Sequence, residues 1–153
     1  MSDPAVKTLS TNRKARHEYH FIETLECGIE LKGTEVKSMR SGRFAFADAY
    51  GWVENDQLWL LGFHVSPYDF GNRHNHDPDR RKRLLVHRQE IIKLKRRVVE
   101  KGLTLVPVRV YLRKGKVKLE LAVARGKKMY DKRADIRNRD MKRDADREMH
   151  SRD

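Results

Sequence analysis

The sequence has a single cysteine, Cys27, and no long apolar run. A lone thiol forms no internal disulfide, which fits a protein of a reducing compartment. No apolar stretch approaches the roughly 20 residues that a transmembrane helix needs. The start of the chain also lacks the hydrophobic core of a signal peptide. We therefore expect a cytoplasmic protein that does not bind a membrane.

Motifs of catalysis are also missing. There is no glycine-rich phosphate-binding loop, no paired-carboxylate motif and no serine nucleophile elbow. Cys27 has no Cys–His signature, and a lone cysteine beside a strand is usually a small apolar residue. His74 and His76 lie beside carboxylates and could hold a divalent ion, but no second ligand cluster accompanies them. We expect no enzyme, no cofactor and no metal, and keep a metal-dependent nuclease as a minor alternative.

Positive charge is what the chain has in excess. The 153 residues include 35 Lys and Arg against 22 Asp and Glu, a formal net charge of +13. This excess predicts attraction to a polyanion, either nucleic acid or an anionic membrane surface. The length suffices for one ordinary domain with its own core.

The last 28 residues, 126–153, differ from the rest of the chain. They hold ten Lys or Arg and seven Asp or Glu, with one Tyr and no Leu, Val, Phe or Trp. So little apolar surface cannot offset the entropy of ordering, which predicts a tail that is disordered when free. Oppositely charged pairs at helical spacing, such as Asp135 and Arg139, favour a helix once a polyanion holds the tail.

The body shows the two-residue period of strands and one helical segment. We predict a strand over 19–27, a hairpin of strands 42–52 and 58–65 around Asn55-Asp56, and a helix over 84–101 that ends at Gly102. Strands over 103–113 and 117–125 follow, and Pro107 marks an edge or a bulge. Segments 27–32 and 35–40 stay ambiguous.

These elements predict a mainly β fold with helices. It is a small antiparallel barrel of the oligonucleotide-binding (OB) type, with five or six strands and about three helices or turns. We divide the chain into a disordered N-terminus (1–11), the barrel (12–125) and the basic tail (126–153).

Three clusters in the body favour RNA as the polyanion. Residues 12–19 mix basic groups with His and Tyr rings that can stack on unpaired bases. Residues 80–83 form a basic run, and Lys116 and Lys118 point outward together from one strand. Their joint presence around one barrel, with the tail, predicts RNA binding.

Four segments carry a resemblance to a known family: 12–19 (NRKARHEY), 32–38 (KGTEVKS), 77–85 (DPDRRKRLL) and 124–133 (ARGKKMYDKR). In sequence and order they resemble the bacterial small protein B family, the SsrA-binding proteins that partner transfer-messenger RNA (tmRNA). The resemblance implies an OB-type barrel and rescue of stalled ribosomes by trans-translation. It also implies a monomeric, non-enzymatic adaptor that works with alanyl-charged tmRNA and elongation factor Tu.

The resemblance also implies site residues. The body would bind the tRNA-like domain of tmRNA through Asn12, Glu26, Leu85 and Lys118. His17 would reach the decoding centre of the small ribosomal subunit, and the tail would enter the empty mRNA channel and become helical there. The start of the tail would be formed by Gly126, Lys127, Lys128, Tyr130, Asp131, Lys132 and Arg133. Tyr130 stands where some family members carry His, so its ring can stack but cannot become cationic. Composition alone equally allows a constitutive ribosomal protein that binds rRNA, which we keep as the alternative.

Overall fold

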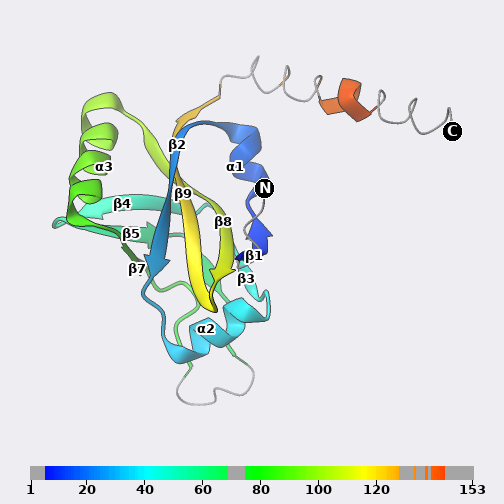
Figure 1. The fold of residues 1–153 in the computed structure, drawn as a ribbon, viewed down its shortest axis with the longest axis vertical. Coiled ribbons are helices and arrows are strands. Elements are labelled where there is room, and N and C mark those ends of the chain that lie inside the picture. Colours follow the sequence, from blue (N-terminus) through cyan, green and yellow to red (C-terminus); the bar gives the residue numbers. More distant parts are fainter. Residues whose placement is uncertain (1–5, 69–74, 128–132, 134–136, 138, 144–153) are drawn as a thin grey trace, which may run out of the picture.

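Six antiparallel strands close into a barrel in the computed structural model, which describes residues 6–68, 75–127, 133, 137 and 139–143 (Figure 1). The strands are β1 (Val6–Thr11), β2 (Tyr19–Ile29), β3 (Phe44–Ala45), β4 (Tyr50–Glu54), β5 (Gln57–Leu61), β6 (His64–Val65), β7 (Lys82–Leu85), β8 (Thr104–Arg113) and β9 (Lys116–Gly126). The helices are α1 (Arg13–Glu18), α2 (Gly33–Arg40) and α3 (Arg88–Lys101). Strands pair in the order β8, β4, β5, β7, β2 and β9, and β9 pairs again with β8. The prediction of an antiparallel OB-type barrel is confirmed.

The barrel interior is filled by the inward-facing residues of these strands. Along β9, buried positions alternate with less buried ones from Lys116 to Leu121, as the sequence period predicts. In the part of the chain that the structure describes, the fully buried leucines include Leu60, Leu105, Leu119 and Leu121. Each leucine side chain taken out of water stabilises the fold by about 1.5–3 kcal/mol. Among the described residues, no helix is long and apolar enough to cross a membrane.

Two tight hairpins set the register of four barrel strands. Asn55 and Asp56 join β4 to β5, and both have positive φ (52° and 58°). Lys114 and Gly115 join β8 to β9 with φ of 51° and 78°. Two-residue turns of this kind match the twist of the flanking strands and favour Asn, Asp and Gly. The turn predicted at Asn55-Asp56 is confirmed, and the two strands predicted over 103–113 and 117–125 form the second hairpin.

Pro107 lies at an irregularity, as predicted. The pairing of β8 with β9 shifts register between Pro107 and Arg109. A proline has no N–H to donate to a ladder, so a bulge accommodates it inside a strand.

The N-terminal boundary was predicted wrongly. Residues 1–11 were expected to be disordered, but Val6–Thr11 forms β1 and pairs with the part of β8 around Arg109–Arg113. Pairing with β1 satisfies backbone groups on that edge of β8, and Leu9 packs against the core. The barrel unit therefore begins no later than Val6, while residues 1–5 lie outside the described residues.

The strand expected over 42–52 is broken in the middle. Phe44 and Ala45 form β3, which pairs with β6 in a separate small sheet, and β4 begins only at Tyr50. Between them Ala47 has a φ of 47°. The rings of Phe44, Phe46 and Phe63 pack together with centroids 5.6–6.0 Å apart, which turns this segment inward.

The helices also differ in extent from the predictions. The ambiguous segment 35–40 belongs to α2, while Cys27–Ile29 continues β2 rather than forming a helical turn. The helix expected from Leu84 starts at Arg88, because Leu84 and Leu85 pair within the barrel. Gly102 ends α3 with a φ of 62°, as predicted. Ile92 and Val99 are 49% and 71% exposed and so lie outside the apolar face of α3 that buries Leu94.

Candidate nucleic-acid interface

Three of the four residues that the resemblance assigns to tmRNA binding lie together on the surface of the barrel. Gly28 of β2 pairs with Leu85 of β7 on one side and with Lys118 of β9 on the other. Glu26 lies two residues before Gly28, on the same face of β2. Two hollows of about 420 and 410 Å³ share Gly28, Leu85 and Lys118 as lining residues, and Glu26 lines the second. We call the surface formed by Glu26, Gly28, Leu85 and Lys118 the groove.

Gly28 forms the floor of the groove because it has no side chain. A Cβ atom built at this position would lie 3.2 Å from Cβ of Leu85 and 3.5 Å from its Cδ1. A side chain there would occupy the space between Leu85 and Lys118. Nothing in the local sequence indicates this role, since a glycine inside a strand points only to a bulge or a close approach of backbone.

Glu26 is held as an ionised carboxylate. The Tyr111 hydroxyl donates a 2.5 Å hydrogen bond to Oε1, and Nε of Arg113 donates a second of 2.8 Å to the same oxygen. The Tyr111 hydrogen bond lowers the pKa of Glu26 against the opposing effect of burial, and the charges of Arg113 and Lys118 lower it further. A carboxylate has acceptor sites on both of its oxygens, so Glu26 can also accept a hydrogen bond from a ribose or base donor.

The rest of the groove combines an apolar side chain with a cation. Leu85 is 46% exposed although its strand, β7, lies between β2 and β5 in the sheet. It therefore offers an apolar platform at the surface. Lys118 supplies a positive charge, and Lys116 lines the adjoining hollow two residues away on β9. A cation for phosphate, an apolar platform for a base and an acceptor for sugar or base donors are the groups that RNA recognition uses.

Asn12, the fourth residue that the resemblance assigns to tmRNA binding, lies outside the groove. Its side chain accepts a 3.2 Å hydrogen bond from the N–H of Ala15 and so caps α1, and it donates a 2.9 Å bond to the carbonyl of Pro107. The residue is only 8% exposed and lines a separate hollow of about 190 Å³ with Lys14 and Asp48. The contacts of Asn12 are those of a structural residue.

His17 and the start of the tail lie together at the other end of β9. Gly126 pairs with Tyr19, and the N–H of Lys127 donates a 2.8 Å bond to the carbonyl of Glu18 at the end of α1. Figure 1 shows α1 near the end of β9 and α2 near its start. Lys118 and Gly126 are eight residues apart on one strand, a separation of about 26 Å. The groove and the tail start are therefore two distinct surfaces.

Most of the predicted tail residues lie outside the described part of the chain: Lys128, Tyr130, Asp131 and Lys132. Arg133 is helical and exposed, and residues 139–143 are also helical. Nη2 of Arg139 lies 3.4 Å from Nδ1 of His17. This contact brings one tail side chain to the ring that the resemblance assigned to the decoding centre.

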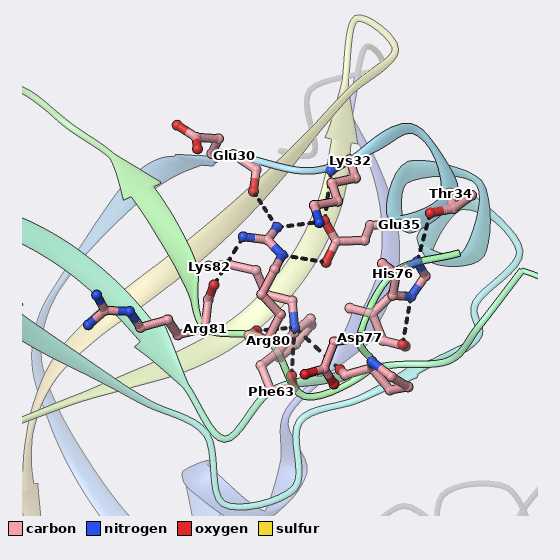
Figure 2. Close-up of polar contacts among 12 residues, drawn as sticks. Glu30, Lys32, Thr34, Glu35, Phe63, His76, Asp77, Arg80, Arg81 and Lys82 are labelled. Atoms are coloured by element: carbon pink, nitrogen blue, oxygen red, sulfur yellow. Dashed lines mark hydrogen bonds and ion pairs between the residues drawn. The ribbon is translucent and has the colours of Figure 1, made fainter. Parts of the chain in front are cut away.

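The basic run 80–83 is not a free basic patch. Figure 2 shows the guanidinium of Arg80 against Glu35 and the ammonium of Lys82 bonded to backbone carbonyls. Arg81 pairs with Glu54 at 3.1 Å, and Arg83 pairs with Glu30 at 2.7 Å. Each of these cations already has a partner in the protein.

A buried polar cluster therefore forms where the sequence predicted an RNA contact. Glu35 is fully buried and accepts bonds of 2.6 and 3.3 Å from the guanidinium of Arg80 and 2.7 Å from the N–H of Lys32. Lys82 is also fully buried, and its ammonium donates to the carbonyls of Phe63 (2.9 Å) and Arg80 (2.7 Å). Burial lowers the pKa of Lys82. We call Glu35, Arg80 and Lys82 the buried cluster; it ties α2 to the segment that leads into β7.

The histidine pair does not form a metal centre within the described residues. His76 is 5% exposed, and its two ring nitrogens lie 2.9 Å from the carbonyl of Val65 and 2.8 Å from Oγ1 of Thr34. His74 lies outside the described residues. No group of three His, Cys, Asp or Glu suited to a metal occurs among the residues that the structure describes. His76 is explained as a hydrogen-bonded core histidine.

Cys27 is equally unsuited to nucleophilic chemistry. It is fully buried, and burial, assisted by the charges of Glu90 and Glu26, raises the pKa of its thiol to about 12. The thiolate is the reactive form, so this thiol is inert at neutral pH.

Comparison with known proteins gives a consistent result. A family model described as SmpB protein matches residues 9–151. An SsrA-binding protein of Desulforamulus reducens is 56% identical over 152 residues, which cover 99% of this chain and 94% of that protein. One from Treponema denticola is 49% identical over 149 residues, covering 97% of each chain. A chain in a solved structure described as "tmRNA-SmpB: a journey to the center of the bacterial ribosome" is similar with a TM-score of 0.66. It is 45% identical, and the match covers 78% of this chain and 85% of that one.

Proposed function

Because the chain belongs to the SmpB family of SsrA-binding proteins, we propose that it is a tmRNA-binding adaptor of trans-translation, the process that rescues stalled ribosomes. The observation that carries this proposal is the groove. Glu26, Leu85 and Lys118 come from three strands and are far apart in sequence, yet they meet around Gly28. We infer that the groove binds the tRNA-like domain of tmRNA.

The tail has a different task in this proposal. Gly126 and Lys127 leave the barrel beside His17, about 26 Å along β9 from Lys118. The protein would thus use separate surfaces for its two tasks. The groove would hold one RNA domain, and the tail would lie in the decoding centre and the empty mRNA channel. We propose that the tail residues from Gly126 to Arg133 act there, and that the tail becomes helical as it enters the channel.

The adaptor itself carries no reaction in this account. We propose that it works in the cytoplasm as a monomer, and that alanyl-charged tmRNA and elongation factor Tu supply the amino acid and its delivery. A constitutive ribosomal protein is not favoured, because the relatives are named for binding SsrA RNA. A metal-dependent nuclease is not favoured either, since both ring nitrogens of His76 form hydrogen bonds, one with Val65 and one with Thr34.

The proposal is tested by two kinds of variant. Leu85→Ala and Lys118→Ala should each weaken tmRNA binding in a filter-binding titration, because each removes a group of the groove. Ile92→Ala and Lys101→Ala are the matched controls, since Ile92 is exposed to nearly the same degree as Leu85 and Lys101 is an exposed lysine on α3. Equal effects of groove and control variants would refute the groove as the binding surface.

Deletion of residues 130–153 should separate binding from tagging. The shortened protein keeps the groove, so it should bind tmRNA with nearly unchanged affinity. It should fail to support tagging of peptides on stalled ribosomes in a reconstituted translation reaction. Normal tagging by the shortened protein would rule out the role proposed for the tail.

A further inference from the structure

The outer face of the hairpin β4–β5 carries an exposed aromatic surface. Trp52 and Trp59 are directly paired across the two strands. Trp52 is 46% exposed, and Tyr50, two residues before it on the same face, is 42% exposed. Buried positions at Gly51, Leu58 and Leu60 show that the opposite face of this hairpin fills the barrel. Large aromatic side chains this exposed are unusual in a soluble fold and mark a contact surface.

A guanidinium is already stacked on this surface. The Arg81 guanidinium carbon lies 4.0 Å from the centre of the Trp59 ring, and Arg81 also pairs with Glu54 of β4. Arg83 lies opposite Trp59 in the pairing of β7 with β5 and has Glu30 as its partner. Both ion pairs are substantially exposed, so each contributes little to stability and a phosphate can replace the carboxylate at low cost.

The aromatic surface is continuous with the groove. β7 pairs with β5 on one edge and with β2 on the other. Its outward residues are Arg83 and Leu85, because Lys82 and Leu84 are buried. The outer surface of the barrel thus passes from Lys118 over Gly28 and Leu85 to Trp59 and Trp52. Five adjacent strands, four spacings of about 4.8 Å, make this path about 19 Å wide.

We propose that Trp52 and Trp59, with Arg81, form a second RNA contact on which an unpaired nucleotide of the RNA held in the groove stacks. Aromatic rings interleaved with guanidinium groups bind bases through stacking and their phosphates through charge. A protein with a net charge of +13 favours a polyanionic occupant over an ordinary protein surface. The inference rests on the proposed function, because the RNA at the groove is the one that reaches this surface.

The two tryptophans of this surface are the only ones in the chain, so its intrinsic fluorescence reports on the surface directly. In a Trp59→Phe variant, Trp52 is the only tryptophan, and excitation above the tyrosine absorption band selects its emission. Titration of that variant with full-length tmRNA transcript should quench the Trp52 emission as a base stacks on it. Trp52→Ala should weaken tmRNA binding at least about fivefold, the lower range for loss of one stacked base. Trp52→Phe keeps a stacking ring and should lose much less.

Control variants distinguish this contact from the groove and from a folding defect. Val99→Ala removes an apolar side chain that is 71% exposed on α3 and should leave binding unchanged. Circular dichroism melting of each variant shows whether the barrel is intact. If Trp52→Ala binds tmRNA as the wild type does while Leu85→Ala does not, the second contact is wrong and the proposed function stands. If instead Trp52→Ala lowers only co-sedimentation with ribosomes, the surface binds another partner and the inference is also overturned. Failure of the wild-type protein to bind tmRNA would refute the proposed function itself.

Discussion

Replacing Glu35 by alanine should destabilise the barrel strongly. The Glu35 carboxylate is fully buried and accepts hydrogen bonds from the guanidinium of Arg80 and from the N–H of Lys32. The variant removes this acceptor. It also removes the negative charge that most strongly favours the buried ammonium of Lys82. Removal of one partner from a buried ion pair costs about 3–5 kcal/mol, because the other charge stays buried and uncompensated.

The magnitude converts into a melting temperature. For a domain of this size a loss of 1 kcal/mol lowers the melting temperature by roughly 2–4 °C, so Glu35→Ala should lower it by roughly 6–20 °C. The matched control is Glu54→Ala. Glu54 pairs with Arg81, the neighbour of Arg80, but both side chains are 49% exposed, so this change should cost less than about 1 kcal/mol. Thermal denaturation followed by circular dichroism measures both, and equal shifts for the two variants would refute the reasoning.

The effect of Glu35 should depend on pH with a definite sign. Burial raises the pKa of Glu35, but hydrogen bonds from Arg80 and from the N–H of Lys32, and the charges of Arg80 and Lys82, outweigh it and lower the pKa. A carboxyl with a lowered pKa in the folded state stabilises the protein above its unfolded value of about 4.3. That contribution is lost as the pH falls through the folded value. The difference in melting temperature between wild type and Glu35→Ala should therefore be full at pH 7 and should shrink below about pH 4.

Four further predictions concern single residues and the tail. Gly28→Ala should weaken tmRNA binding, because the new Cβ would lie 3.2 Å from Cβ of Leu85. Loss of a contact worth about 1.4 kcal/mol weakens binding roughly tenfold. Gly33→Ala is the control, since a Cβ there meets nothing within 4 Å. Asn12→Ala should lower the stability by about 0.5–2 kcal/mol through loss of the helix cap, and an unchanged melting temperature with weaker RNA binding would contradict this. Cys27 should resist thiol reagents in the native protein at pH 8 and react after denaturation, because burial raises its pKa to about 12. A peptide of residues 126–153 should show little helix by circular dichroism in buffer, and a stable helix without RNA would disprove folding on entry into the channel.

Local signals predicted the hairpins of the fold well. Asn55, Asp56 and Gly115 are residue types that tolerate positive φ, and the structure places them in two-residue turns, the last together with Lys114. The alternation along β2 and along the first half of β9 likewise follows from a strand whose one face is buried. These features depend on neighbours in sequence, so the sequence contains the information that determines them.

Features that depend on distant partners were missed. β1 forms by pairing with an edge of β8, about a hundred residues later in the chain, where it satisfies backbone hydrogen-bonding groups. Lys82 looked like a surface lysine in a basic run, yet Glu35 and Arg80 meet across 45 residues and Lys82 faces inward beside them. The sequence of residues 80–83 alone does not distinguish a buried lysine from an exposed one. Once residues 82–85 are known to form a strand, Lys82 and Leu84 lie on its buried face.

The site residues came from the resemblance and not from periodicity. Leu85 and Lys118 have ordinary local contexts, and their common feature is that both pair with Gly28. Asn12 came from the same resemblance, but its hydrogen bonds to Ala15 and Pro107 give it a structural explanation instead. Geometry therefore separates the residues that the resemblance groups together into those that line the groove and one that caps a helix.

The buried cluster and the groove are mechanically connected through β7. This strand has four residues, and its pairing with β2 consists of Gly28 with Leu85 and Ile29 with Leu84. Such a short strand depends on what holds its start, and Lys82, its first residue, is bound to the carbonyls of Phe63 and Arg80. A loss of Glu35 should then loosen Leu85 as well as the barrel. Glu35→Ala should bind tmRNA more weakly than wild type even at 10 °C, where most of it is folded. Unchanged affinity there would mean that the pairing with β2 and β5 alone fixes Leu85.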